Sequence, residues 1–187
     1  MSKIVISGYY GFANAGDEAM LTAIIKALRS TEKTVELTVI SGNPPATAAR
    51  HKVNSLHRFS FCKIFAALMD CDLLLSGGAV FCRILPASAV CYIICLSCFG
   101  PAAQKKVMLF GQGIGPIHNR LMRRLTKFIC SRVDLITVRD QDSLYELRRI
   151  GVPAEKVQLT ADSVLTLPQE SKEKRTRAAA AVWCTAR

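Results

Sequence analysis

The chain has 187 residues, which is enough for one average domain or for one half of a two-domain protein. Half of its residues are hydrophobic and 21% are charged, so a disordered or fibrous protein is excluded. The net charge of +11 favours anionic partners, but the few aromatic residues do not interleave with a basic stripe, and no nucleic-acid partner is expected.

Hydrophobic periodicity predicts strands and helices that alternate along the chain. The predicted strands are 3–7, 35–41, 72–76, 106–110, 135–138 and 157–160, and the predicted helices are 17–29, 61–69, 119–132 and 142–150. Segment 42–45 contains two prolines and is expected to be a loop. We therefore expect an α/β fold, a Rossmann-like doubly wound parallel sheet over residues 1–167, with an irregular tail over 168–187.

The loop after the first predicted strand is the first candidate site, because ligands bind beyond the carboxyl ends of strands in such a sheet. Its candidate residues are Gly11, Asn14, Gly16, Asp17 and Glu18. Glycines let backbone N–H groups approach a ligand, and the following helix N-terminus favours an anion or a polar sugar. The alternative is a strand-to-helix turn whose glycines only satisfy positive φ. The loop lacks both the GxGxxG spacing and the lysine of a P-loop.

Three later strand ends supply the other candidates. Gln112, followed by Gly113, either hydrogen-bonds a sugar hydroxyl or holds its own loop as a buried amide. Arg139 is suited to a phosphate or a carboxylate, but it could equally pair with Asp140 and fix the loop. Asp162 is either an acid of the site or a cap of the next element.

Cysteines, histidines and the N-terminus give less specific signals. The eight cysteines include no matched CxxC pairs, so no metal site is predicted. His51, His57 and His118 lack ligand spacing and are expected at the surface. The N-terminal run is too short and too polar for a signal peptide, which favours a cytoplasmic protein with free thiols.

Two further segments raise the question of a membrane. Residues 84–103 are uncharged and, by length alone, could form a span. The predicted helix 119–132 is basic and amphipathic, and we expect its cationic side to be solvated or to face a membrane rather than to line an active site. Its cations are Arg120, Arg123, Arg124, Lys127 and Arg132.

Four ordered motifs resemble the polysaccharide pyruvyltransferase family. They are 8–19 (GYYGFANAGDEA), 73–78 (LLLSGG), 111–116 (GQGIGP) and 136–143 (ITVRDQDS). The resemblance is nearest to the CsaB type, which modifies a bacterial cell-wall polymer, and it runs from about residue 3 to 163. Asp162 and Ser163 look like the family's Ala-Asp-Pro strand end, with serine in place of proline.

The resemblance implies a GT-B-like enzyme of two Rossmann-type halves. Such an enzyme would transfer enolpyruvate from phosphoenolpyruvate, its donor substrate, to a lipid-linked or polymeric saccharide, and it would need no other cofactor. The net charge of +11 fits attraction to an anionic lipid-linked substrate, so peripheral contact with the inner leaflet of the membrane is expected. The resemblance implies that the saccharide is held by Asn14, Asp17, Glu18 and Gln112, and it assigns Arg139 to the anionic groups of the donor. Asp17, Glu18 and Arg139 are the catalytic candidates.

The sequence departs from the family in two places. No second strand–loop–helix domain follows residue 167, so a truncated chain that is inactive alone is expected. Residues 79–102 recover a family-like run when their codons are read one base out of register, and we expect a frameshift there. Two alternatives remain: a non-catalytic sugar or nucleotide-sugar binding domain, and a small membrane-anchored protein that uses 84–103 as its span.

Overall fold

The computed structural model describes residues 1–32, 34–77 and 105–167. The segments expected to be frameshifted, membrane-spanning or an irregular tail lie outside these ranges. Within them, no helix is both long enough and apolar enough to cross a membrane.

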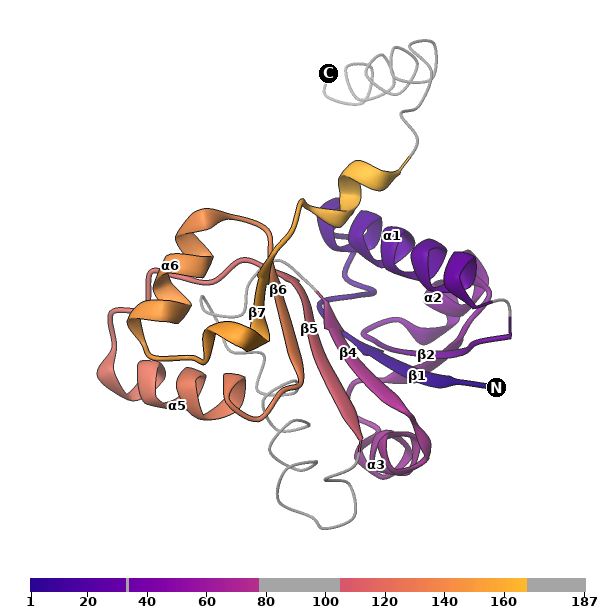
Figure 1. Cartoon of the computed structure of the whole chain (residues 1–187). Helices are drawn as coiled ribbons and strands as arrows, with labels where there is room; N and C mark the ends of the chain where they lie inside the picture. The colour runs from indigo at the N-terminus through magenta and orange to yellow at the C-terminus, as the bar shows by residue number, and fades with distance from the viewer. Residues whose placement is uncertain (33, 78–104, 168–187) are drawn as a thin grey trace, which may run out of the picture.

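The described residues form a seven-stranded parallel sheet in the order β3-β2-β1-β4-β5-β6-β7 (Figure 1). Its strands are β1 (Lys3–Ser7), β2 (Glu36–Ser41), β3 (Asn54–His57), β4 (Leu73–Gly77), β5 (Lys106–Gln112), β6 (Leu135–Val138) and β7 (Val157–Leu159). The order reverses between β1 and β4, which pair in parallel register from Ile4 and Leu73 onward. This reversal defines a doubly wound sheet, so the predicted fold class is confirmed.

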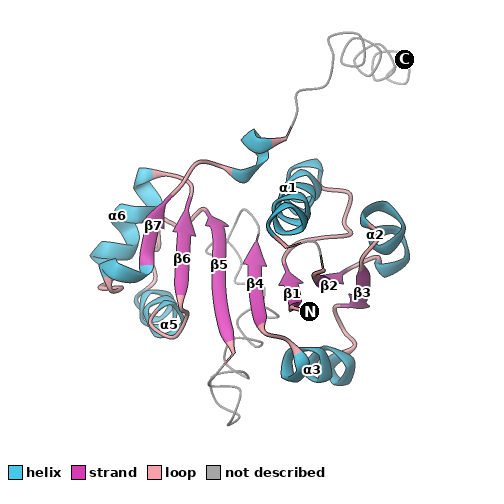
Figure 2. Ribbon diagram, turned by 45° about the vertical axis from the view of Figure 1, so that its right-hand side comes forward, coloured by secondary structure: helices cyan, strands magenta, loops and turns pink. Residues whose placement is uncertain are grey.

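Helices cover both faces of the sheet (Figure 1). One face carries α1 (Ala15–Thr31) and α2 (Pro44–His51), and the other carries α3 (Phe61–Asp70), α5 (Arg120–Cys130) and α6 (Gln141–Arg149). Two short 3-10 helices, η2 (Ala154–Lys156) and η3 (Ser163–Thr166), flank β7. Figure 2 shows the chain passing from β7 across the carboxyl ends of the strands to η3, which packs against α1.

The hydrophobic core lies in two layers because successive residues of a strand point to opposite faces. In β1, Ile4 and Ile6 pack in the layer under α1, whereas Val5 packs in the layer under the opposite helices. Leu21 and Ile24 of α1 are fully buried in the first layer. The central strands β1, β2, β4 and β6 are therefore covered on both faces, as expected for parallel strands with apolar runs, whereas the edge strands β3 and β7 are largely exposed.

The predicted elements match the structure within two residues at each end, but α2, β3 and the two short 3-10 helices were missed. Segment 42–45 is not a loop throughout, because Pro44 begins α2 and the Asn43 side chain accepts a hydrogen bond from the Ala46 N–H at 3.4 Å. Proline is tolerated in a first helical turn, where its missing N–H is not needed. The short polar strand β3 was also missed, and His51 is buried rather than at the surface.

Candidate functional site

The sheet brings every predicted site residue to its carboxyl edge. Residues 11–18 follow β1, Gln112 ends β5, Arg139 follows β6 and Asp162 follows β7. In Figure 2 the arrowheads of these strands point to one edge, beside α1 and η3. The edge includes the reversal between β1 and β4, where open parallel sheets bind ligands.

Gly11 has a structural reason to be glycine. Its φ is +81°, and a Cβ there would overlap the Ser41 hydroxyl oxygen and press on the backbone N of Asn43. The preceding Tyr10 carbonyl accepts a hydrogen bond from the Gly42 N–H at 2.9 Å. The β1–α1 loop therefore lies directly against the end of β2, and positive φ is needed for that approach.

Glu18 links this loop to α2. Its carboxylate accepts a hydrogen bond from the Gly11 N–H at 2.8 Å, and it lies 3.3 Å from the Arg50 guanidinium and 3.6 Å from His51 Nε2. Only 13% of the Glu18 side chain is exposed. Burial lowers the pKa of His51, although Glu18 opposes this shift. The carboxylate thus faces the loop and α2, where it anchors both.

Asn14 and Asp17 begin α1. The Asn14 side chain caps the helix by accepting a hydrogen bond from the Gly16 N–H at 3.0 Å. Asp17 is buried in the first turn, where a carboxylate is favoured by the helix dipole. Burial above all, and then Asp17, raise the pKa of the enclosed Tyr10 phenol. The Tyr10 hydroxyl has no hydrogen-bond partner among the residues that the structure describes.

Gln112 is a buried amide that joins two strands. Its Nε2 donates to the Ser76 carbonyl of β4 at 2.8 Å. The preceding Gly111 N–H donates to the Thr137 hydroxyl at 2.8 Å, and the Ile114 N–H donates to the Ser143 hydroxyl at 2.7 Å. The motifs 111–116 and 136–143 are therefore hydrogen-bonded to each other. Gly113 lies in the loop between these contacts, where β5 ends.

Arg139 lies between two carboxylates at the ends of β6 and β7. Its Nη1 is 3.5 Å from Asp162 Oδ2 and its Nε is 3.8 Å from Asp140 Oδ2, and 32% of the side chain is exposed. Asp162 also caps η3 through a hydrogen bond from the Val164 N–H at 3.0 Å. Burial would raise the pKa of Asp140, but hydrogen bonds from Ser143 and the charge of Arg139 outweigh it, so the pKa is lowered.

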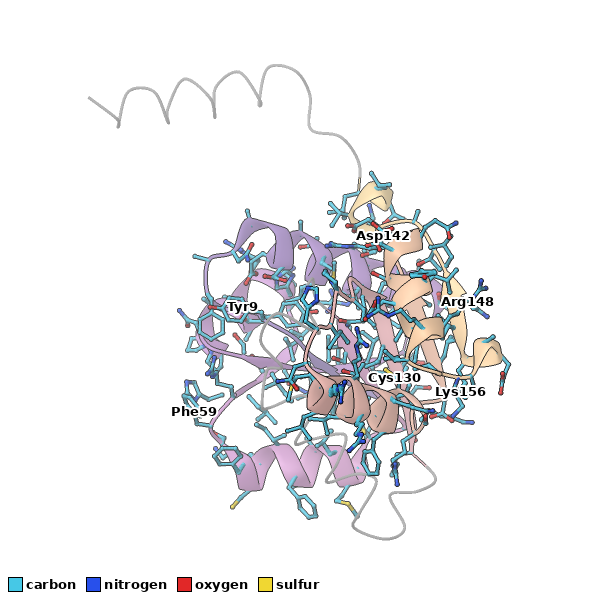
Figure 3. The ribbon with its side chains drawn as sticks, turned by 90° about the vertical axis from the view of Figure 1, so that its left-hand side faces the viewer. Tyr9, Phe59, Cys130, Asp142, Arg148 and Lys156 are labelled. Carbon is cyan, nitrogen blue, oxygen red and sulfur yellow. The ribbon has the colours of Figure 1, made fainter. Side chains whose placement is uncertain are left out.

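An exposed aromatic group at the same edge was not predicted. We call Tyr9, Phe12, Arg58 and Phe59 the aromatic platform. The Tyr9 and Phe12 rings stack at 4.3 Å, and the Arg58 guanidinium lies 5.1 Å from the Phe12 ring and 4.7 Å from the Phe59 ring. Figure 3 shows Tyr9 and Phe59 on the same side of the molecule. The sequence signal was the aromatic residues Tyr9 and Phe12 in one loop and Phe59 in another, but only β3 brings the loops together.

A separate cavity lies away from this edge. It has a volume of about 420 Å³ and is lined by the amino-terminal parts of β1 and β2, by β3 and by α3, with Lys3, Glu36, Asn54 and Asp70 among its polar residues. It includes none of the predicted site residues. The described residues contain no cluster of three His, Cys, Asp or Glu side chains that could hold a metal ion.

Comparisons with known proteins agree with this architecture. The structure of Anabaena HepE with UDP-glucose is similar with a TM-score of 0.61 and 14% identity, over 87% of this chain and 44% of that chain. The UDP-GlcNAc 2-epimerase of Methanocaldococcus jannaschii gives a TM-score of 0.62 and 13% identity, over 88% and 46%. The S. aureus MnaA–UDP structure gives 0.58 and 15%, over 92% and 49%.

These similarities show the Rossmann-like half of a GT-B-type fold. The chain spans about half the length of the structures it resembles. No match is found among curated proteins. The sequence model of the polysaccharide pyruvyl transferases, however, matches residues 14–184, and the chain therefore belongs to the polysaccharide pyruvyl transferase family.

Proposed function

We propose that the enzyme containing this chain transfers a pyruvyl group from phosphoenolpyruvate to a saccharide. The methylene carbon of the donor gains a proton, and two sugar hydroxyls form bonds to the neighbouring carbon as its bond to the phosphate oxygen breaks. One hydroxyl proton balances the new methyl group and the other leaves with inorganic phosphate. The product is a cyclic ketal that bears a methyl group and a carboxylate.

The observation that carries the proposal is the position of Arg139 at the carboxyl edge. The reaction needs cations that hold the donor carboxylate and stabilise the leaving phosphate. The distances of 3.5 and 3.8 Å from Arg139 to Asp162 and Asp140 exceed those of strong charge-assisted hydrogen bonds, which are about 2.8 Å. A donor phosphate or carboxylate could therefore bind the guanidinium more closely than either aspartate does.

The acceptor saccharide is assigned to the aromatic platform and to Asn14. Aromatic rings offer flat apolar faces that pack against the C–H faces of a sugar, while Arg58 can donate hydrogen bonds to hydroxyl groups. Glu18 and Gln112 already hydrogen-bond to the Gly11 N–H and the Ser76 carbonyl, so we assign them to positioning the loops. The acceptor could be lipid-linked or polymeric, because the platform is open to solvent.

Donor binding can be tested on the 187-residue chain with phosphoenolpyruvate by calorimetry. Arg139→Ala should weaken binding by at least about tenfold, since hydrogen bonds to charged groups are worth ~1.5–3 kcal/mol. Arg139→Lys should recover part of the affinity, because lysine keeps the charge but loses the planar guanidinium. Arg148→Ala on the exposed face of α6 is the matched control.

Equal affinity in the unchanged chain and in Arg139→Ala would refute the donor assignment. A non-catalytic saccharide-binding role is the second candidate, and the aromatic platform is the observation that favours it. If the chain has this role, it binds an N-acetylhexosamine oligosaccharide and Tyr9→Ala abolishes that binding, while phosphoenolpyruvate does not bind at all.

A further inference from the structure

One helix carries most of the positive charge imbalance of the described residues. Segment 118–133 contains five cationic side chains and no carboxylate. Outside this segment, the cationic and acidic side chains of the described residues nearly balance. A surface helix that contacts only solvent commonly carries both acidic and basic side chains at spacings of three and four residues. The absence of acidic side chains from α5 therefore favours an anionic partner.

The exposed side of α5 combines these charges with large apolar side chains. Arg120, Arg124 and Lys127 are exposed, and their spacing places them on one side of the helix. Leu121 is 66% exposed and Phe128 is 40% exposed; they lie seven residues apart and therefore on one line beside the cations. The exposed side thus consists of a basic strip and a parallel apolar strip.

The opposite side of α5 fixes the helix to the domain. Ile129 and Cys130 are buried in the core layer shared with α6. At the start of the helix, the Asn119 side chain caps α5 and the Arg123 Nε donates to the Ile117 carbonyl at 2.6 Å. These contacts fix the rotation of the helix about its axis. The two exposed strips therefore have a set orientation.

The three cations that form the basic strip are available to a partner. Among the described residues, no carboxylate forms an ion pair with Arg120, Arg124 or Lys127. Beyond the end of the helix, Arg132 lies 3.4 Å over the Phe128 ring and donates to the Phe128 carbonyl at 3.3 Å. The apolar strip is thus bordered by cations on more than one side.

We propose that the exposed side of α5 binds an anionic membrane surface. Arg120, Arg124 and Lys127 contact lipid phosphates, and Leu121 and Phe128 enter the boundary between head groups and acyl chains. Interfacial helices combine basic residues with Leu and Phe in this way. A nucleic acid is a poorer match, because the most exposed apolar residue, Leu121, offers no ring for a base to stack on.

The position of α5 is compatible with substrate binding at the other edge. Figure 2 shows α5 beside the lower, amino-terminal part of β6, away from the arrowheads of the strands. A membrane bound through α5 therefore leaves the carboxyl edge uncovered. This inference does not rest on the proposed donor chemistry, since membrane binding is measured without any substrate.

The test is co-sedimentation of the 187-residue chain with lipid vesicles. One set contains phosphatidylcholine with roughly one-third phosphatidylglycerol, and the other contains phosphatidylcholine alone. The triple variant Arg120→Gln/Arg124→Gln/Lys127→Gln should bind the anionic vesicles about a hundredfold more weakly, at roughly fivefold for each cation lost. The double variant Leu121→Ala/Phe128→Ala should lower affinity roughly tenfold even at high salt, which screens the charges.

The matched control removes the same charge elsewhere. Lys26, Lys63 and Arg148 are exposed on other helices, and their joint replacement by glutamine should leave vesicle binding unchanged. Far-ultraviolet circular dichroism checks that each variant folds. Equal loss in both triple variants, no loss in either, or equal binding to phosphatidylcholine alone would overturn the proposal. Binding of a short RNA in place of vesicles, with the same dependence on α5, would also overturn it.

Discussion

Replacing Glu18 with alanine should destabilise the domain by about 2–3 kcal/mol. The largest part comes from the Gly11 N–H, which donates to the partly buried carboxylate at 2.8 Å, and hydrogen bonds to charged groups contribute ~1.5–3 kcal/mol. The Arg50 ion pair adds only about 0–1 kcal/mol, since its guanidinium side chain is 65% exposed. A loss of this size is a large fraction of the ~5–15 kcal/mol typical of a whole domain.

Glu18→Gln separates the hydrogen bond from the charge. Glutamine keeps an oxygen for the Gly11 N–H, so the loss should fall to about 1 kcal/mol, the difference between a charged and a neutral acceptor. Urea unfolding followed by circular dichroism measures both variants, and a constant slope with denaturant shows that only stability has changed. Glu155→Ala, on the exposed surface of η2, is the control and should leave the midpoint unchanged.

The outcome also bears on catalysis. If Glu18→Ala unfolds at the same urea concentration as the unchanged chain, the carboxylate does not anchor the loop. A role as a catalytic acid would then be the better explanation of a carboxylate at this position. If stability falls as expected, a loss of activity in Glu18→Ala cannot by itself be assigned to chemistry.

Substitutions at three further polar residues test two buried groups, Tyr10 and His51, and one helix cap, Asp140. Tyr10→Phe should leave stability unchanged or raise it by up to about 1 kcal/mol, because it removes a buried hydroxyl without a partner among the described residues; a clear loss in thermal unfolding would show a missed partner. Burial lowers the pKa of His51, so the free energy of unfolding is highest above its ordinary pKa of 6.5 and falls as the pH drops below it. His51→Gln should flatten that decline in urea titrations from neutral to acidic pH, and an unchanged decline in this variant would contradict the explanation. Asp140→Ala should cost about 1 kcal/mol by removing the cap that accepts the Ser143 N–H at 2.7 Å, and Asp140→Asn should cost less; equal losses in chemical denaturation would contradict the capping role.

The sequence alone was sufficient to predict the strands at the core of the fold. Apolar runs such as 73–75 and 135–136 stop at glycine or polar residues, and this pattern predicts buried parallel strands directly. The sequence was not sufficient to predict β3 (Asn54–His57) or α2 (Pro44–His51). β3 is short, polar and at the edge of the sheet. The two prolines that begin α2 are typical of a loop, and only the structure shows that Asn43 caps a helix there.

The location of the candidate site was predictable, but the direction of its side chains was not. Strand ends follow from the pattern alone, so Gln112 and Glu18 were placed at the correct edge. Their partners are long-range or belong to missed elements: Gln112 donates to Ser76, 36 residues earlier, and Glu18 contacts α2. The aromatic platform was missed for the same reason, because Arg58 and Phe12 meet only when β3 lies beside β2.

These contacts change how the family motifs should be used to assign function. Residues 111–116 and 136–143 hydrogen-bond to each other through Gly111 and Ile114, so part of each motif preserves the ends of β5 and β6. Substitutions within these contacts should lower stability and activity together. Arg139 and the aromatic platform are partly exposed, and their removal leaves most of the core packing intact. A variant that loses ligand binding without losing stability therefore identifies a substrate contact, and the structure places the best candidates for that result at Arg139 and Tyr9.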